Sequence, residues 1–261
     1  MLKRELKVNL KSFIMWTLII SSIIIVAYLF YPALDETASF DELLESLPKE
    51  LLMALNMDIV NINTPYGWFA TEGYLMLALL GGCYSSLLGG SIVIKEESEK
   101  TIEFLMSKPI SRVKIIKDKL IAGLIYIFSL NLILFFVSFI GLTLLDDLNF
   151  KMLLLLSGSV LFIHFIFYFL SLFISLFFKK SKKMVGISLG LVLGTYFLQV
   201  LAMLDEKIEF LKYFSPHEYF SARYIIINES YNLNYLILTF IIIFTTTVLS
   251  IKIYKNKEFT L

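Results

Sequence analysis

Apolar residues run along this chain in six long stretches, separated by segments that carry most of the charge. The stretches cover residues 13–31, 73–94, 120–145, 152–178, 184–204 and 235–251. An α-helix rises about 1.5 Å per residue and the hydrocarbon core of a bilayer is about 30 Å thick, so runs of this length predict membrane-spanning helices. The pattern therefore predicts an all-α, polytopic membrane protein that forms a single domain over residues 1–261.

The positions of lysine and arginine predict which side of the membrane each connecting segment occupies. Eighteen of the 23 lie in four places: the N-terminus, residues 95–119, the turn at residues 179–183 and the C-terminal tail. Because short loops rich in these residues stay on the cytoplasmic side, we expect six spans with both termini in the cytoplasm. Residues 32–72 and 205–234 then form outer segments, and most acidic residues fall on that side.

The first eleven residues predict an amphipathic helix at the cytoplasmic membrane surface. Leu2, Leu6 and Leu10 recur every four residues, with basic residues between them. Such a helix rests its apolar side on the bilayer and keeps its charges in water. A signal peptide is the alternative, but the following apolar run is too long and no small-residue cleavage site comes after it.

Residues 95–119 form the only long charged segment with a membrane-length apolar run on both sides. Ser98 can cap a short helix, and Ser111 can cap the helix that leads into the third span. Between them, Ile102, Leu105 and Met106 are spaced three and four residues apart, which places them on one helical face. A short amphipathic helix here suits docking onto a partner protein; the alternative is a charged loop lying on lipid headgroups.

This loop also carries a motif. Residues 96–112 read EESEKTIEFLMSKPISR, which resembles the first cytoplasmic loop of the ATP-binding-cassette (ABC) type 2 permeases. In that family the loop is the coupling helix, which sits in a groove of a separate ATPase subunit. The family often has glycine before the threonine, where this chain has Lys100.

The resemblance implies a set of ATPase-coupling residues in this loop. The apolar stripe would fill the groove of the partner, and Glu103 would pair with a basic group. The implied set is Glu97, Glu99, Thr101, Ile102, Glu103, Leu105, Met106 and Pro109.

The six-span pattern extends the resemblance to the whole chain and implies a function. Members of the family are membrane subunits of exporters, in which two permease copies pair with two ATPase subunits. They move antibiotics, peptides, lipids or ions outward, and several confer drug resistance. We therefore expect a homodimeric permease in a bacterial plasma membrane, surrounded by lipid, with ATP and Mg²⁺ on the partner and no cofactor on this chain.

The chain itself shows no motif for catalysis or metal binding. It lacks the G-x-x-x-x-G-K-[ST] phosphate loop, H-E-x-x-H and G-x-S-x-G, so any ATPase activity is expected in a partner chain. Its one cysteine, Cys83, excludes an intramolecular disulfide and a thiolate cluster. A net charge of +1 gives no indication of nucleic-acid binding. A secondary carrier or channel is the main alternative function, and a membrane-embedded enzyme is a weaker one.

Small residues repeat every four positions in two of the spans. The second span has Gly81, Ser85 and Gly89, with a parallel row one residue on, and such rows let helix backbones approach closely. In the resembling family the first and fifth spans form the dimer seam. We therefore expect the second-span row to pack inside the protomer and the fifth-span row to lie at the seam, although packing inside the protomer is open for both. The fifth-span row is Gly186, Gly190 and Gly194.

Three polar residues fall inside predicted spans, namely Asn131, His164 and Gln199. A polar group in hydrocarbon is costly unless it is paired, so each either bonds to a neighbouring helix or lines a transport path. His164 is the candidate for pH sensitivity, but no second titratable residue lies at its depth, which argues against a proton-coupled carrier.

The second outer segment contains a further family-like pattern. Residues 213–220 read YFSPHEYF, which is similar to the Leu-Ser-Pro-Phe-x-Tyr-Phe of the family, with Phe214 and His217 as departures. The resemblance implies short helices that dip partway into the membrane from outside.

Overall fold

The computed structural model describes residues 1–35, 52, 64–107, 109–203 and 206–258, which are almost entirely helical. Six of the described helical segments are long and apolar enough to cross a membrane. This result confirms the predicted all-α fold with six candidate spans. They are α1 (Leu2–Asp35); α4 (Pro65–Trp68), which continues through the π-helical turn η1 (Phe69–Gly73) into α5 (Tyr74–Ile92); α8 (Arg112–Leu144); α9 (Phe150–Ser175); α10 (Ser181–Ala202); and α13 (Leu233–Asn256).

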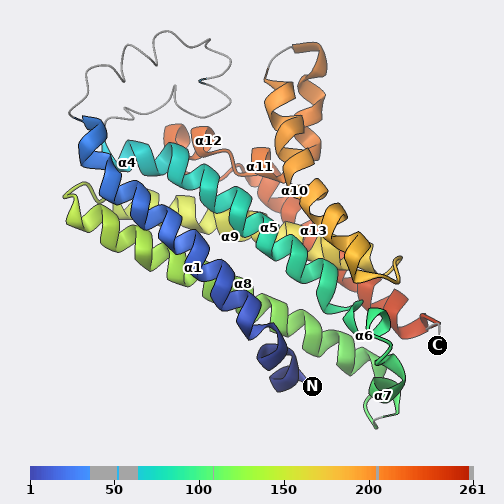
Figure 1. Ribbon diagram of the computed structural model, residues 1–261. Helices are drawn as coiled ribbons and strands as arrows, with labels where there is room; N and C mark the ends of the chain where they lie inside the picture. Colours follow the sequence, from blue (N-terminus) through green and yellow to red (C-terminus); the bar gives the residue numbers. More distant parts are fainter. Residues whose placement is uncertain (36–51, 53–63, 108, 204–205, 259–261) are drawn as a thin grey trace.

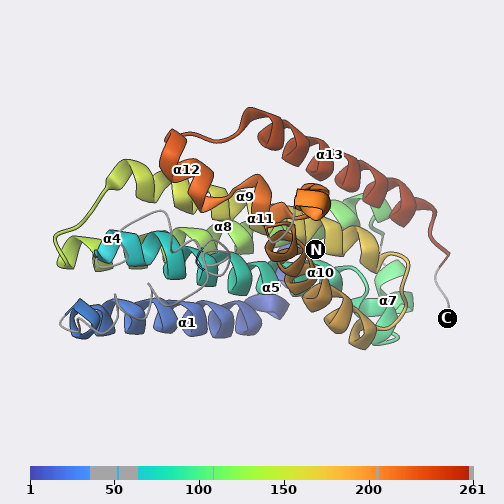
Figure 2. The same ribbon diagram turned by 90° about the horizontal axis from the view of Figure 1, so that it is seen from above.

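The pair α5 and α9 forms the centre of the molecule, where the two helices lie side by side (Figure 1). Seen from above, α1 and α13 lie at opposite edges, with α5, α8 and α9 between them (Figure 2). Most of α5 is buried, whereas α1, α10 and α13 bury only a minority of their residues. These three helices therefore offer apolar surface to lipid or to another subunit.

The segments predicted to be cytoplasmic meet at one end of the bundle. The amino group of Met1 lies 3.6 Å from the Asp118 carboxylate at the start of α8. The backbone N–H of Ser181 donates to the Ser98 hydroxyl at 3.1 Å. The C-terminus of the described chain lies nearby (Figure 1). We call this the loop end: residues 1–11, 95–119, 179–183 and 252–258.

The short helices of the loop end begin only partly where the sequence predicts. Ser111 caps α8 as expected, since its hydroxyl accepts from the backbone N–H of Lys114 at 3.3 Å. Ser98 does not cap a helix; it is the last residue of α6 (Lys95–Ser98). A turn then separates α6 from α7 (Ile102–Met106), whose N-cap residue Thr101 makes no side-chain cap. The prediction that Ser98 caps this helix was wrong, because the turn shifts the N-cap position three residues along the chain, from Ser98 to Thr101.

The segment after α10, predicted to lie outside, contains three short helices among its described residues, as the resemblance implies. They are η2 (Glu206–Phe214), α11 (Pro216–Tyr219) and α12 (Ala222–Asn228). At this end the backbone N–H of Tyr66 donates to the Asp147 carboxylate at 2.8 Å, joining α4 to the turn between α8 and α9. Most of the other predicted outer segment, residues 32–72, lies outside the described residues.

Candidate coupling site

The turn between α6 and α7 has a backbone conformation that favours glycine. Lys100 has φ of 57°, in the left-handed region. A side chain with a Cβ atom pays about 1–2 kcal/mol to adopt this region, and glycine pays almost nothing. This is the position where the resembling family often has glycine. Lys100 therefore keeps the turn at a cost in conformational energy.

The apolar face of α7 is turned into the protein. Ile102 is 3% exposed and Leu105 is 2% exposed, and both belong to the same core cluster as Ile115 and Ile116 of α8. The predicted role of this stripe in a partner's groove stays a prediction. In the protomer, the core covers both side chains, because a five-residue helix has one apolar face and that face points inward here.

The opposite face of α7 is open. Phe104 is 70% exposed, and Glu103 is exposed beside it. Met106, from the predicted stripe, is only partly buried. The remaining predicted coupling residues that stay exposed are Glu99, Thr101 and Pro109. The exposed face of α7 therefore carries an aromatic ring and the carboxylate of the preceding residue.

Glu96, next to this surface, belongs to a buried ionic cluster. The Lys119 ammonium is fully buried, and it donates to both Glu96 carboxylate oxygens at 2.9 Å. It also donates to the Ile92 carbonyl at the end of α5 at 2.6 Å. Glu5 of α1 lies 3.4 Å from the same ammonium, and Arg4 lies 3.5 Å from Glu96. The cluster thus joins α1, α5, α6 and α8.

Glu97 points to a different partner. Its carboxylate accepts a hydrogen bond from the Lys257 ammonium at 2.6 Å. Lys257 is the first residue after α13. Arg112 donates to the Lys257 carbonyl at 2.7 Å and to the Lys255 carbonyl at 3.3 Å. Glu97, predicted to contact the ATPase, therefore pairs within its own chain.

Sequence reasoning missed the partners in these contacts. Lys119 directly precedes the third apolar run, and Glu5 interrupts a basic amphipathic helix. A charge at such a boundary is a signal for pairing, because it would otherwise be buried alone. Lys257 gives no such signal, since basic residues are common in cytoplasmic tails.

The structure brings two of the three intramembrane polar residues together. Asn131 donates to the Ile127 carbonyl at 2.8 Å and lies 2.9 Å from His164 Nδ1. His164 Nε2 lies 3.1 Å from the Leu77 carbonyl, so Nε2 carries the donor hydrogen and Nδ1 accepts from Asn131. Both ring nitrogens are used inside the protomer. This arrangement supports interhelical hydrogen bonding rather than a role in a transport path.

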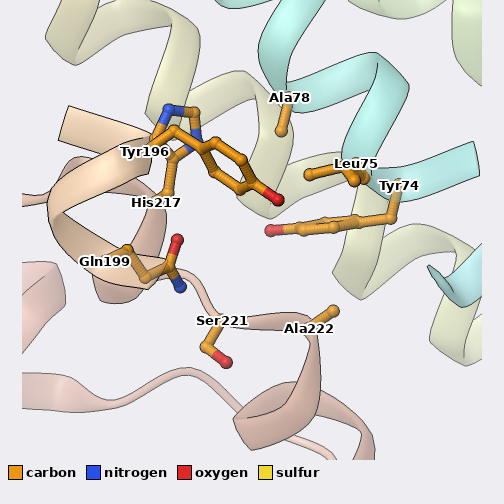
Figure 3. Close-up of a pocket in the computed structure, with 8 residues that line it drawn as sticks. All are labelled: Tyr74, Leu75, Ala78, Tyr196, Gln199, His217, Ser221 and Ala222. Atoms are coloured by element: carbon orange, nitrogen blue, oxygen red, sulfur yellow. The ribbon is translucent and has the colours of Figure 1, made fainter. Parts of the chain in front are cut away.

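Gln199 lies elsewhere, beside a small cavity between the start of α5 and the end of α10 (Figure 3). Its amide donates to the Glu218 carboxylate of α11 at 2.9 Å. The cavity volume is about 20 Å³, which suffices for one water molecule but not for a transported antibiotic or peptide. The lining residues are Tyr74, Leu75, Ala78, Tyr196, Gln199, His217, Ser221 and Ala222.

His217 is the histidine that lines this cavity. Its ring lies against Phe167 of α9 and Tyr196 of α10, with centroids 5.2 and 5.7 Å apart. Burial lowers the pKa of His217 from its ordinary 6.5 to about 4, partly opposed by the Val192 carbonyl. Burial also raises the pKa of Glu218, while its bond to Gln199 acts in the other direction.

The two glycine rows have opposite surroundings. A Cβ atom on Gly89 would clash with the Tyr168 carbonyl oxygen of α9, and one on Gly81 would clash with the His164 ring. The predicted packing of the second-span row inside the protomer is therefore confirmed. On α10, a Cβ atom at any of the three glycines would meet no atom within 4 Å in the described chain.

Taken together, the six candidate spans define the class: a polytopic membrane protein, with a charged loop at one end of the bundle. Among the residues the structure describes, no group of His, Cys, Asp and Glu could hold a metal ion.

The family model described as "ABC-2 family transporter protein" matches residues 1–259. The chain therefore belongs to the ABC-2 transporter family and is its membrane permease, a part that lacks a nucleotide-binding site. No curated protein sequence matches the chain.

Proposed function

We propose that this permease is the membrane subunit of an exporter whose loop end faces the cytoplasm and docks onto a separate ATPase through α7. Two copies would pair with two ATPase chains in a bacterial plasma membrane, with ATP and Mg²⁺ bound by the ATPases. The observation that carries the proposal is the outward face of α7, where Phe104 and Glu103 are exposed on a helix whose other face is fixed in the core.

Phe104 would supply most of the binding energy at this contact. A large aromatic side chain that enters a desolvated pocket is the usual anchor of a protein interface. Glu99 and Glu103 would pair with basic groups at the rim, where charges guide association more than they add affinity. The basic segments of the loop end support its cytoplasmic placement, since they hold 18 of the 23 lysines and arginines.

The buried face of α7 would transmit the movement of the ATPase. Ile102 and Leu105 lie in one core cluster with residues of α5 and α8. Packed cores shift as units rather than deform continuously. A push on α7 would therefore tilt the second and third spans together, which is the mechanical step the proposal requires.

The open row of glycines on α10 supports the placement of a dimer seam there. Small residues allow close approach of helices, and nothing in the described chain occupies this face. The exported molecule would be an antibiotic, a peptide, a lipid or an ion. A susceptibility profile of a strain that lacks this chain would identify its class.

The test replaces both parts of the proposed anchor, as Glu103→Lys with Phe104→Asp. We expect the ATPase to be lost when the affinity-tagged permease is purified from its native membrane, because the ring can no longer enter an apolar pocket and the rim charge is reversed. The quantity to measure is the molar ratio of ATPase to permease. Both positions are exposed, so the permease should still elute as a folded species.

Phe177→Asp is the matched control. Phe177 is 63% exposed and lies just beyond α9, near the basic turn of the loop end. It should leave the ATPase ratio unchanged, since it is not on α7. A wild-type ratio in the α7 double variant would show that the ATPase docks elsewhere or not at all.

A further inference from the structure

Glu96 and Glu97 are neighbours on α6, yet they bind opposite ends of the chain. Glu96 reaches Lys119 and, through that ammonium, Glu5 near the N-terminus. Glu97 reaches Lys257 near the C-terminus. Two successive residues of a four-residue helix thus connect the coupling loop to both termini.

These contacts are buried rather than superficial. Lys119 is fully buried, and the side chains of Glu5, Glu96 and Glu97 are each only 3–4% exposed. A surface ion pair contributes little, but the loss of one partner from a buried pair leaves an uncompensated charge and is strongly destabilising. The contacts therefore hold the segments in one specific arrangement.

Further contacts fasten the same two ends. At the N-terminus, the Met1 ammonium lies 3.6 Å from Asp118, and the Leu2 backbone N–H donates to that carboxylate at 3.2 Å. At the C-terminal side, Arg112 donates to two carbonyls of the tail. All of these partners belong to residues 96–119, the loop and the first turns of α8.

Apolar packing also holds the helices that carry the two ends, since Leu6 packs against the main core cluster and Tyr254 lies within it. Both α1 and α13 bury only a minority of their residues. At the loop end, the ionic contacts add to this packing and connect both helices to the coupling loop and the start of α8. A displacement of the loop would be passed to them through these charges.

We propose that Glu96 and Glu97 are positioning residues that make α1 and the tail after α13 move with the coupling loop. This inference rests on the proposed function, because the displacement originates in the docked ATPase. The moving unit would then comprise both chain ends as well as the second and third spans.

Two release variants each weaken the attachment of one end, and they keep the Lys119–Glu96 pair and the contacts of Asp118 and Arg112 intact. Arg4→Met with Glu5→Leu removes one positive and one negative charge from the α1 side. Glu97→Gln with Lys257→Met removes both charges of the tail pair, so neither charge is left buried alone. The controls are Lys7→Met on α1 and Lys255→Met on α13, because both of these lysine side chains are exposed.

The first measurement is backbone amide hydrogen exchange of the full-length permease in lipid nanodiscs, without ATPase. We expect the α1 variant to speed exchange about tenfold in residues 2–12 only, and the tail variant to do so in residues 252–258 only. Neither control should change exchange in these segments. Unchanged exchange in both release variants would overturn the inference, whatever the ATPase does.

The second measurement repeats the exchange on the complex co-purified with its ATPase, with and without a non-hydrolysable ATP analogue. In the wild type, the nucleotide should change exchange in the loop and in both ends. Each release variant should keep the nucleotide response of the loop and lose that of its own end. A purely structural role predicts faster exchange with the nucleotide response retained, and that result would overturn the inference. Failure of the wild type to hold an ATPase would instead refute the proposed function.

Discussion

The second and fifth spans carry the same spacing of small residues in opposite environments. On α5 the glycines contact α9 and α10 so closely that a single added carbon would clash. On α10 the three glycines face open space in the described protomer. The comparison shows that four-residue spacing indicates a capacity for close approach, and that the neighbouring helix decides whether the capacity is used within the protomer.

The substitution with the largest expected effect on the difference between the two glycine rows is Gly89→Ala on α5. The added methyl group would meet the backbone carbonyl of Tyr168, which cannot rotate away as a side chain can. We expect a loss of about 3 kcal/mol or more in folding stability, because α5 and α9 must separate along the centre of the bundle. The measurement is the thermal midpoint and the monodisperse yield of the purified permease.

Gly186→Ala on α10 is its matched partner. The same methyl group there meets no atom within 4 Å, and alanine is favoured over glycine within a helix. The thermal midpoint should stay the same or rise slightly. Equal destabilisation by the two substitutions would contradict the difference between the rows.

The second test concerns how α11 is held against α9 and α10. His217 packs between α9 and α10, and its pKa is lowered to about 4 from 6.5. Neutral His217 therefore stabilises the docked outer segment fully above pH 6.5. That contribution, up to about 3 kcal/mol, is lost as the pH falls from 6.5 towards 4. The measurement is amide exchange of residues 206–228 as a function of pH.

The stability contribution of the nearby Glu218 carboxyl group depends on pH in the opposite direction. Because the pKa of Glu218 is raised, its favourable contribution is present in acid and is lost as the pH rises through that raised value. His217→Phe should remove the acid-induced loosening, and Glu218→Gln should leave it in place. Persistence of the full acid response in His217→Phe would assign it to another group.

The third test addresses the open row directly through Gly190→Leu. The larger side chain would keep a second copy of α10 at a distance, so self-association should weaken by about tenfold, equivalent to about 1.4 kcal/mol. Folding of the protomer should be unaffected. Crosslinking yield in native membranes is the readout, and an unchanged dimer would place the seam on another helix.

The smallest expected effect on stability comes from the hydrogen bond between Asn131 and His164, beside the glycine row of α5. Asn131→Leu removes the side-chain bond to His164, which packs against Gly81. Interhelical hydrogen bonds in membranes average about 0.6 kcal/mol, so the thermal midpoint should drop only slightly. Transport should persist. Its complete loss in a folded variant would indicate that Asn131 and His164 line the transport path.

The sequence predicted the spans because each apolar run is long enough to be independent of its neighbours. It predicted the Ser111 cap because that cap is local. It placed Ile102 and Leu105 on one face correctly but assigned that face to a partner, because periodicity shows which residues share a face and not what covers it. The Glu97–Lys257 contact joins residues 160 positions apart, and no local pattern encodes it.

The exposed ring of Phe104 has a consequence for how a cell makes this protein. Under the proposed docking, the ATPase would cover this ring, so permease made in excess of ATPase would keep an apolar contact surface exposed. Matched synthesis of the two chains would keep that surface covered.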